Sequence, residues 1–530
     1  MKSSDHNDAR EIGSTGTLAL PVNPWLIAAA VVLPTFMEVL DTTIVSVALP
    51  YIAGNLSAST SQATWVQTSY LISNAIVLPA SAWFSSFFGR KRYFMVSIAV
   101  FAVASLLSGL APSLGFLVAA QLLMGAGGGA LQPLSQAILM ESFPPEKRGK
   151  AMSVWALGVV VAPVLGPVVG GWITDHYTWR WLFYINVPVS VVALWMIQQF
   201  IADPPYLCNS KPGRIDAIGF GLLALWLATM QTVLDKGQED DWFSAVWIRW
   251  FSLISVISLI ALIIWELRDK SPIVNLRVLT NRNFFLGFVI VTLIGILSYS
   301  PLTLLPLFQQ NLLGYTALQS GLAQYPRGIG SLLVLPLVGF LSSRMDNRKI
   351  IVAGIILTAS SSLMLGNINL DVAKSNFNLA NLLQGAGVAT AFVPLATTAM
   401  GLLRNEQMGN ATGLFNLMRN LGGSIGISMV TTMLARGAQV HQTVLVAHLT
   451  PFDPNFQAAL QANQAALAPG VGPAQAQLMA PGVVYNSLLQ QSSLLAYVDD
   501  FRRLALLSFA SILAVVWLKR VSVKGSIAVH

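Results

Sequence analysis

The chain has 530 residues, of which 55% are hydrophobic and only 10% charged, and its mean hydropathy is +0.65. Soluble domains carry about 25% charged residues, so this composition excludes an ordinary soluble protein and predicts a polytopic membrane protein. The net charge of +8 comes from basic residues in short segments between apolar stretches, which fits the positive-inside rule and argues against nucleic-acid binding.

Apolar stretches of about 20 residues predict fourteen transmembrane helices. They lie near residues 24–50, 63–84, 93–111, 114–140, 150–173, 181–201, 215–234, 246–267, 284–309, 316–342, 349–370, 378–402, 409–434 and 498–518. Most Lys and Arg residues then fall on the side of the two chain ends, which predicts that both termini are cytoplasmic. The expected fold class is an all-α membrane protein.

Two carboxylates, Glu38 and Asp41, lie inside the first predicted helix. A carboxylate at the centre of a membrane helix costs roughly 2.5–3.5 kcal/mol on insertion scales, so it usually faces a cavity and handles protons or ions. The two residues share one helix face, and two such groups resist double ionisation, so one should hold a proton near neutral pH. We expect proton coupling at Asp41, with Glu38 as a second group. The alternative is a structural hydrogen-bond role.

In the fourth predicted helix, polar and small residues recur at spacings of three and four. They are Gln121, Gly125, Gly128, Gln132 and Gln136, which share one helix face. Amide side chains facing lipid would be unsatisfied, so we expect this face to line a central substrate cavity, with the three glutamines as lining residues. For the glycines, helix packing is the more common reason.

The fifth predicted helix contains Pro163, Gly166, Pro167 and Gly170. Prolines inside a membrane helix free carbonyl groups and bend it, and glycines let a neighbouring helix approach. These residues are therefore predicted to form a gating hinge, the alternative being a static kink.

Two arginines, Arg327 and Arg419, lie deep inside predicted helices of the C-terminal half. An unpaired guanidinium is costly there, so each should meet a carboxylate, carbonyl groups or water. We predict that both line the substrate cavity, while a structural tie to carbonyls stays open as the alternative.

An internal repeat appears at an offset of about 260 residues. The run Leu122-Leu123-Met124-Gly125-Ala126-Gly127 returns as Leu382-Leu383-Gln384-Gly385-Ala386-Gly387, and a proline follows each copy, Pro133 and Pro394. The chain is therefore predicted to hold two pseudo-symmetric six-helix bundles, at 24–203 and 271–520, with two inserted helices at 204–270 between them. Short tails at 1–23 and 521–530 complete this division.

Several short motifs, in order, resemble those of the major facilitator superfamily in its fourteen-helix drug:proton antiporter branch, and the chain is similar over almost its whole length to EmrB-type inner-membrane pumps. The motifs are Leu40-Asp41-Thr42-Thr43 to Pro50 in helix one, Gly89-Arg90-Lys91-Arg92 after helix two, Gly166-Pro167-Val168-Val169-Gly170-Gly171 in helix five, and Trp179-Arg180-Trp181 to Pro188 before helix six. The resemblance implies a bacterial inner-membrane location and a gating role for Gly89, Arg90 and Lys91.

The chain departs from this family at two places. Ser86 and Phe87 stand where relatives carry an acidic and a basic residue before the glycine, so a charged latch between the bundles would be weaker here. Gln121 stands where many relatives have an arginine four residues before Gly125. We expect Arg419 to supply that positive charge.

The segment 435–497 is predicted to be a long external loop with helical patches, and from 454 to 498 it has no charged residue. A disordered polar tract is the alternative. In EmrB-type pumps a similar loop is present, and the resemblance implies a periplasmic adaptor and an outer-membrane channel as partners.

Enzyme chemistry is disfavoured, since the chain has no Gly-x-x-x-x-Gly-Lys-Ser/Thr loop, its histidines lack metal-site spacing and no Ser/His/Asp grouping occurs at one depth. The expected function is proton-coupled efflux of hydrophobic or amphipathic compounds by alternating access, without a cofactor other than the proton gradient. An importer of a small metabolite and a non-transporting membrane scaffold are the alternatives.

Overall fold

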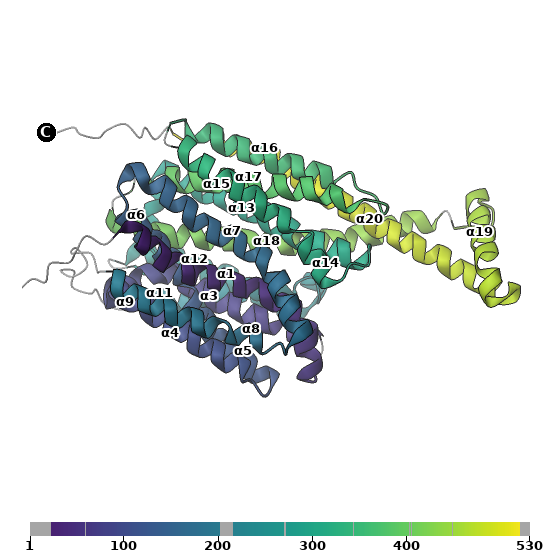
Figure 1. Cartoon of the computed structure of the whole chain (residues 1–530), viewed down its shortest axis with the longest axis horizontal. Helices are drawn as coiled ribbons and strands as arrows, with labels where there is room; N and C mark the ends of the chain where they lie inside the picture. The colour runs from purple at the N-terminus through teal and green to yellow at the C-terminus, as the bar shows by residue number, and fades with distance from the viewer. Residues whose placement is uncertain are drawn as a thin grey trace, which may run out of the picture.

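A computed structural model describes residues 23–58, 60–201, 216–269, 272–342, 344–401, 403, 405–447 and 449–519. Residues 1–22 of the predicted tail 1–23, the whole predicted tail 521–530 and the link 202–215 lie outside the described residues. The regular elements of the described residues are α-helices and two short 3₁₀ helices; Figure 1 shows their arrangement.

The N-terminal helices are α1 (Pro24–Asn55), α2 (Thr60–Ala63), α3 (Trp65–Phe88), α4 (Arg90–Gly109), α5 (Leu114–Gly128), α6 (Leu131–Ser142), α7 (Pro145–His176), α8 (Trp181–Tyr184) and α9 (Asn186–Phe200). The elements α11 (Ala217–Lys236), η1 (Trp242–Ser244), α12 (Val246–Arg268) and η2 (Leu276–Thr280) follow. The C-terminal helices are α13 (Arg282–Asn311), α14 (Ala317–Leu322), α15 (Tyr325–Leu341), α16 (Asn347–Leu365), α17 (Lys374–Met400), α18 (Asn405–Val446), α19 (Pro454–Val471) and α20 (Pro473–Val516).

Each of the fourteen predicted spans falls on helical residues of this structure. Among the described residues, ten helical segments are long and apolar enough to cross a membrane, or eleven if the bent α7 is counted as one span. The three other predicted spans lie in α14 and α15, in α18 and in α20. The protein is thus a multi-pass membrane protein, and the number fourteen stays a prediction.

The two halves repeat one set of helix pairings. In the first half α1 packs on α6, α7 and α9, α5 packs on α3 and α4, and α4 packs on α9. In the second half α13 packs on α17, α18 and α20, α17 packs on α15 and α16, and α16 packs on α20. Each helix therefore has the same neighbours as its counterpart in the other half.

The repeated glycines lie at the tightest of these contacts. A Cβ atom on Gly125 would collide with the carbonyl oxygen of Tyr70 in α3, and one on Gly385 with the carbonyl oxygen of Arg327 in α15. On the opposite helix face, a Cβ on Gly127 would lie 2.7 Å from the carbonyl oxygen of Ser97 in α4. Close helix packing, which small residues permit in membranes, therefore explains the repeated glycines.

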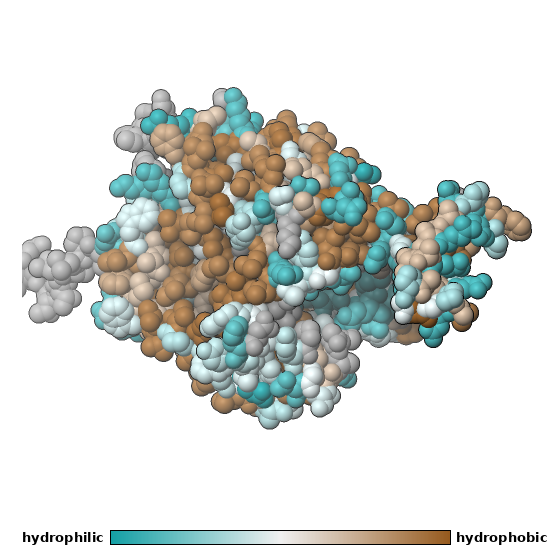
Figure 2. Space-filling model, turned by 45° about the vertical axis from the view of Figure 1, so that its right-hand side comes forward, coloured by the Kyte–Doolittle hydropathy of each residue, from teal (hydrophilic) through white to brown (hydrophobic). Residues whose placement is uncertain are grey.

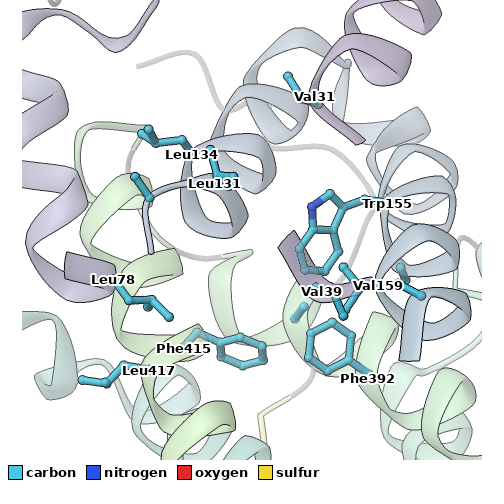
Figure 3. Packing of buried hydrophobic residues seen from close by; sticks show 14 of the residues in the cluster. Val31, Val39, Leu78, Leu131, Leu134, Trp155, Val159, Phe392, Phe415 and Leu417 are labelled. Carbon is cyan, nitrogen blue, oxygen red and sulfur yellow. The ribbon is translucent and has the colours of Figure 1, made fainter. Parts of the chain in front are cut away.

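The halves meet most closely near the end predicted to be cytoplasmic. A Cβ on Gly413 of α18 would lie 3.2 Å from the carbonyl oxygen of Leu78 in α3, and Gly339 of α15 approaches Ser153 of α7. Between these contacts Trp155 stacks near Phe392 with ring centroids 6.2 Å apart, and Phe392 lies 5.9 Å from Phe415 (Figure 3). This apolar layer closes the space between the halves at that end.

The inserted pair α11 and α12 pack on each other, and α11 also packs on α3 and α18, one helix from each half. The outer face of α12 is apolar and exposed, with Trp250, Leu253, Ile257 and Ile260 each 48–60% accessible. In the space-filling view, hydrophobic residues form a broad band over the molecule, which suits contact with lipid tails (Figure 2).

The segment 435–497, predicted as an external loop with helical patches, is helical over most of its length. Helix α18 continues to Val446, α19 occupies 454–471, and α20 begins at Pro473 and runs unbroken into the predicted last span. The many Ala, Leu and Gln residues explain this, because they are good helix formers. These helices project beyond the rest of the molecule (Figure 1), so the alternative of a disordered tract is wrong for the described residues.

Candidate functional site

Glu38 lies at the centre of a buried polar network in the N-terminal half. Its side chain is only 2% exposed, and its two oxygens accept different donors. Asn74 Nδ2 donates to Oε1 over 3.0 Å, Tyr70 Oη donates to the same oxygen over 3.3 Å, and Gln132 Nε2 donates to Oε2 over 2.7 Å. Three helices, α1, α3 and α6, therefore converge on one carboxylate.

Arg419 connects this network to the other half of the molecule. Its guanidinium donates to the side-chain oxygen of Gln132, and the amide nitrogen of the same Gln132 donates to Glu38. The guanidinium also lies 5.4 Å from the ring centroid of Phe392, within range of a cation–π interaction. One glutamine side chain thus links the guanidinium of Arg419 to the carboxylate of Glu38. This is the contact through which the predicted positive charge of Arg419 would act on Glu38.

Asp41 is equally buried but lies in a different set of contacts. Asn186 Nδ2 of α9 donates to Asp41 Oδ1 over 2.8 Å and lies 3.1 Å from Ser105 Oγ of α4. Ser105 in turn donates to the carbonyl oxygen of Phe183 over 2.8 Å. The two carboxylates share a helix, as predicted, but each accepts hydrogen bonds from its own set of neighbours.

The polar face predicted for the fourth helix is divided by the structure. The helix has a turn at Gly129 and Ala130, between α5 and α6, and Gly128 and Gln132 on either side of this turn both face Glu38. Gln121 donates to Ser108 Oγ of α4 over 3.3 Å, inside its own half. Gln136 accepts from Asn416 Nδ2 of α18 over 2.7 Å. The prediction of one continuous cavity wall is therefore corrected.

A cavity lies between the halves, next to this network. It holds about 640 Å³ of empty space, a figure that includes space open to solvent. The lining residues come from α7, α13, α15, α17 and α18: Ala156, Val159, Pro163, Ile294, Ser298, Tyr299, Leu302, Arg327, Val388, Phe392 and Arg419. The two predicted arginines and Pro163 are among them, whereas the three glutamines are not.

The cavity lining is apolar except for a few hydrogen-bonding groups. Arg327 donates from Nη2 to the carbonyl oxygen of Ser298 over 2.7 Å, which is the structural tie that the sequence left open. The hydroxyl of Ser298 and Nε of Arg419 are buried without a hydrogen-bond partner. Since buried polar groups are normally satisfied, these two positions are suited to receive polar atoms of a ligand.

The two predicted hinge glycines of α7 lie on its contact with α1, while Pro163 lines the cavity. The segments 147–163 and 168–174 of this helix differ in direction by 41°, as expected for a helix interrupted by proline. A Cβ on Gly166 would collide with Thr43, and one on Gly170 would lie 2.9 Å from Ile44. The side chain of Pro167 is outside those described. Whether the bend moves during transport stays a prediction.

The residues after helix two hold helices of their own half together. Gly89 has a φ of 84°, a conformation that glycine adopts without strain, and it separates α3 from α4. Arg90 pairs with Glu141 at the end of α6, and Lys91 Nζ donates to the carbonyl oxygen of Gln198 in α9 over 2.7 Å. Their gating role remains a prediction.

Three residues that hold the carboxylates, Tyr70, Asn74 and Asn186, were not predicted as site residues, nor was Asn416, which donates to Gln136. A signal was present, because each is a strongly polar residue inside an apolar helix, like the glutamines that were selected. Among the described residues, no group of three or more His, Cys, Asp or Glu side chains could hold a metal ion.

Comparison with known proteins places these observations in context. The family model of the Major Facilitator Superfamily matches residues 31–427. Multidrug export protein EmrB of Haemophilus influenzae is 38% identical over 433 residues, covering 82% of this chain and 84% of that protein. Multidrug export protein EmrB of Escherichia coli K12 is 36% identical, covering 93% and 94%. The fatty acid resistance protein FarB of Neisseria gonorrhoeae is also 36% identical, covering 92% and 94%.

Solved structures share the fold at low sequence identity. The human organic anion transporter MFSD10 (TETRAN) has a TM-score of 0.56 and 13% identity, covering 93% of this chain and 99% of that chain. A bacterial homologue of the human lysosomal transporter Spinster, in an inward-facing and occupied conformation, has a TM-score of 0.52 and 14% identity, covering 93% and 97%.

Proposed function

Because this chain belongs to the Major Facilitator Superfamily, we propose that it is a multidrug exporter of the bacterial inner membrane that exchanges hydrophobic or amphipathic small molecules for protons. The relatives described as multidrug export proteins support the substrate class. The observation that carries proton coupling is the chain of contacts from the cavity-lining Arg419 through Gln132 to the buried carboxylate of Glu38.

Alternating access follows from the two-half architecture. The apolar layer around Trp155, Phe392 and Phe415 closes the predicted cytoplasmic end, so opening that end requires α7 and α15 to separate, as well as α3 and α18. A substrate in the cavity would contact Arg419, and its charge or bulk would change the contact of Arg419 with Gln132. Because Gln132 also donates to Glu38, substrate loading and the charge of Glu38 influence each other.

The cavity favours amphipathic compounds with one polar or anionic group. Most of its lining is apolar, whereas Arg327 and Arg419 supply positive charge and Ser298 an unpaired hydroxyl. A fatty acid or another hydrophobic weak acid would place its tail against Val159, Ile294 and Leu302. The similarity to a fatty acid resistance protein is consistent with this substrate class.

Everted membrane vesicles test this function. We expect an imposed inward-acidic gradient to drive uptake of a fluorescent amphipathic dye into vesicles that contain the protein, and collapse of the gradient to release it. An importer coupled to protons would instead lose dye under the same gradient. A scaffold would leave dye accumulation equal to that of vesicles from cells without the protein.

We also propose that both chain termini lie in the cytoplasm. The helices that project beyond the rest of the molecule support a further part of the proposal, the docking of a periplasmic adaptor. Phe452 and Leu478 expose 93% and 81% of their surface there, and residues 454–498 carry no charge. Large exposed apolar side chains on a projecting segment indicate a protein contact. An outer-membrane channel would complete the export path beyond such an adaptor.

Substitution of these residues separates docking from transport. The Phe452→Gln/Leu478→Gln variant should lose drug resistance in intact cells and crosslinking to a co-expressed adaptor, but keep proton-driven uptake in everted vesicles. Gln461→Ala, an exposed polar position on α19, is the matched control and should retain both. Unchanged resistance and crosslinking in the double variant would contradict docking at this surface.

A further inference from the structure

A second pair of carboxylates is buried at one end of the inserted helices, away from Glu38 and Asp41. Asp216 precedes α11 and is 7% exposed, and Glu266 lies in the last turn of α12 and is 1% exposed. Asp216 Oδ2 and Glu266 Oε1 are both buried without a hydrogen-bond partner. Both oxygens lie beside Gly219, where a Cβ atom would collide with Asp216 Oδ2 and would lie 2.9 Å from Glu266 Oε1.

The other oxygen of each carboxylate is already occupied. Asp216 Oδ1 accepts the backbone N–H of Gly219 over 2.8 Å and the indole N–H of Trp265 over 2.8 Å. Glu266 Oε2 accepts the backbone N–H of Val274 over 3.3 Å. Asp216 lies at the amino end of α11, which favours a negative charge, whereas Glu266 lies in the last turn of α12, which disfavours one, so Glu266 is the better carrier of a proton.

The described basic residues near this pair, Arg268 and Arg277, form no ion pair with it. Asp269 follows on the same helix and adds negative charge, while Arg268 is exposed and Arg277 donates to the backbone oxygens of Leu267 and Asp269. The adjacent contact with α3 is aromatic, Phe220 against Phe84. Among the described residues, no Lys, Arg or His forms an ion pair with Asp216 or Glu266. Two unpaired buried carboxylates cannot both stay ionised at low cost.

We propose that Asp216 and Glu266 form a second proton-binding site, in which protonated Glu266 donates from Oε1 to the ionised Asp216 Oδ2. The bound proton gives each orphaned oxygen a partner and reduces the charge of the pair from two to one. Gly219 is required there because any side chain would fill the space in which the two oxygens meet.

This site is connected to the contact between the halves. Val274, which donates to Glu266, is followed by Asn275, whose backbone exchanges two hydrogen bonds with the side chain of Asn410 in α18, at 3.1 and 2.9 Å. Next to Asn410, Gly409 and Gly413 pack against α3. Loss of the proton would leave two repelling carboxylates under this link and loosen the hold of residues 272–281 on α18. The inserted helices would thereby report proton concentration to the predicted cytoplasmic gate.

Infrared difference titration of the purified full-length protein in proteoliposomes tests proton binding. In a Glu38→Gln/Asp41→Asn background, a protonated-carboxyl band should be present at pH 7 and should disappear on alkaline titration. Adding Glu266→Gln should remove this band, and adding Asp240→Asn, an exposed carboxylate at the opposite end of the pair, should leave it unchanged. A band that survives Glu266→Gln, or that Na⁺ or Mg²⁺ removes at constant pH, would overturn proton sharing.

Hydrogen–deuterium exchange of residues 272–281 tests the link to the gate. After correction for intrinsic rates, exchange of these residues should rise over the pH range in which the infrared band disappears. Glu266→Gln should abolish this extra rise. Asp216→Asn is the second variant, because Asn still accepts the N–H of Gly219 and so keeps the helix start. An equal rise in all variants would refute the link. Neither readout requires transport, so a failure of the proposed export function would not be confused with a failure here.

Discussion

In the N-terminal half, Gly125 of α5 packs against the backbone of Tyr70, whereas in the C-terminal half Gly385 of α17 packs against that of Arg327. The helix pairings around these contacts are the same in both halves. The side chains differ in charge: Tyr70 donates to the carboxylate of Glu38, while Arg327 lines the cavity as a cation. The helix packing is therefore the same in both halves, whereas the side chains at these two positions differ in their chemistry.

The halves also differ in what their polar groups face. In the first half, both oxygens of Glu38 and one of Asp41 accept hydrogen bonds from within the half. Buried polar atoms without a partner occur in both halves, at Gln136 and Trp179 in the first and at Ser298 and Arg419 in the second, but only the latter two residues line the cavity. We infer that the first half is organised to hold protons and the second to hold ligand, with Arg419 connecting the two.

The largest effect is expected from removing the charge of the first half. Asp41→Asn and Glu38→Gln each keep the side-chain size but remove a proton-binding group, so either should abolish dye uptake driven by the pH gradient in everted vesicles. Downhill exchange of preloaded dye against external dye should continue in both, because the cavity residues are unchanged. Undiminished gradient-driven uptake in one variant would assign coupling to the other carboxylate alone.

Removing the bridge between the halves should have the next largest effect. Arg419→Gln leaves Gln132 without its charged donor, and an unsatisfied buried acceptor costs about 1–3 kcal/mol. We expect transport of an amphipathic anion to fall strongly and that of a neutral dye to fall less. Arg327→Gln should reduce anion transport while preserving the pH dependence of neutral transport, since Arg327 contacts Ser298 and not Gln132.

A control for the Arg419 experiment is Arg249→Gln, an exposed arginine in α12. It should change neither anion nor neutral transport. Equal losses for both substrates in Arg419→Gln would mean that the residue serves packing alone. Arg419→Lys keeps the charge but loses the planar donor set, so partial recovery with Lys would identify charge as the relevant property.

Substitution of the repeated glycines tests whether the packing is equivalent in the halves. Gly125→Ala and Gly385→Ala each force a Cβ against a backbone carbonyl, and overpacking of this kind costs about 1–3 kcal/mol. Both should lower the thermal unfolding temperature in detergent by similar amounts. Gly221→Ala in α11 is the control, because no atom lies within 4 Å of its Cβ position, and it should be neutral or stabilising. If only one of the two variants had a lower unfolding temperature, the packing at the two glycines would not be equivalent.

The helices and their grouping could be predicted because apolar length and repeated glycines are local features of the sequence. Glu38, Asp41, Arg327 and Arg419 could be selected because charge is rare in membrane helices. Their pairing could not be predicted: Gln132 meets both Glu38 and Arg419 because α6 packs on α1 and also on α18, which is a tertiary feature. The helical patches of the segment 435–497 could be predicted, whereas the continuity of α20 from Pro473 into the last span was missed because the lack of charge resembles a linker.

The smallest effect is expected at a pair of equivalent amide side chains that neither bind the buried carboxylates nor line the cavity. Gln121 lies four residues before Gly125 and donates to Ser108, and Asn381 lies four residues before Gly385 and donates to the carbonyl oxygen of Ala323 over 2.9 Å. Gln121→Leu and Asn381→Leu each remove one such hydrogen bond, worth about 0.5–1.5 kcal/mol. Both variants should transport dye at nearly the parent rate with slightly lower thermal stability.

This pair is informative because many relatives carry arginine at the position of Gln121. If Gln121→Leu abolished gradient-driven uptake while Asn381→Leu did not, the coupling machinery would extend along α5 towards Ser108, and Arg419 would not be its only polar link. If the two variants behave alike, the exchange of arginine for glutamine has made the two amides equivalent, and the positive charge that acts on Glu38 comes from the opposite half.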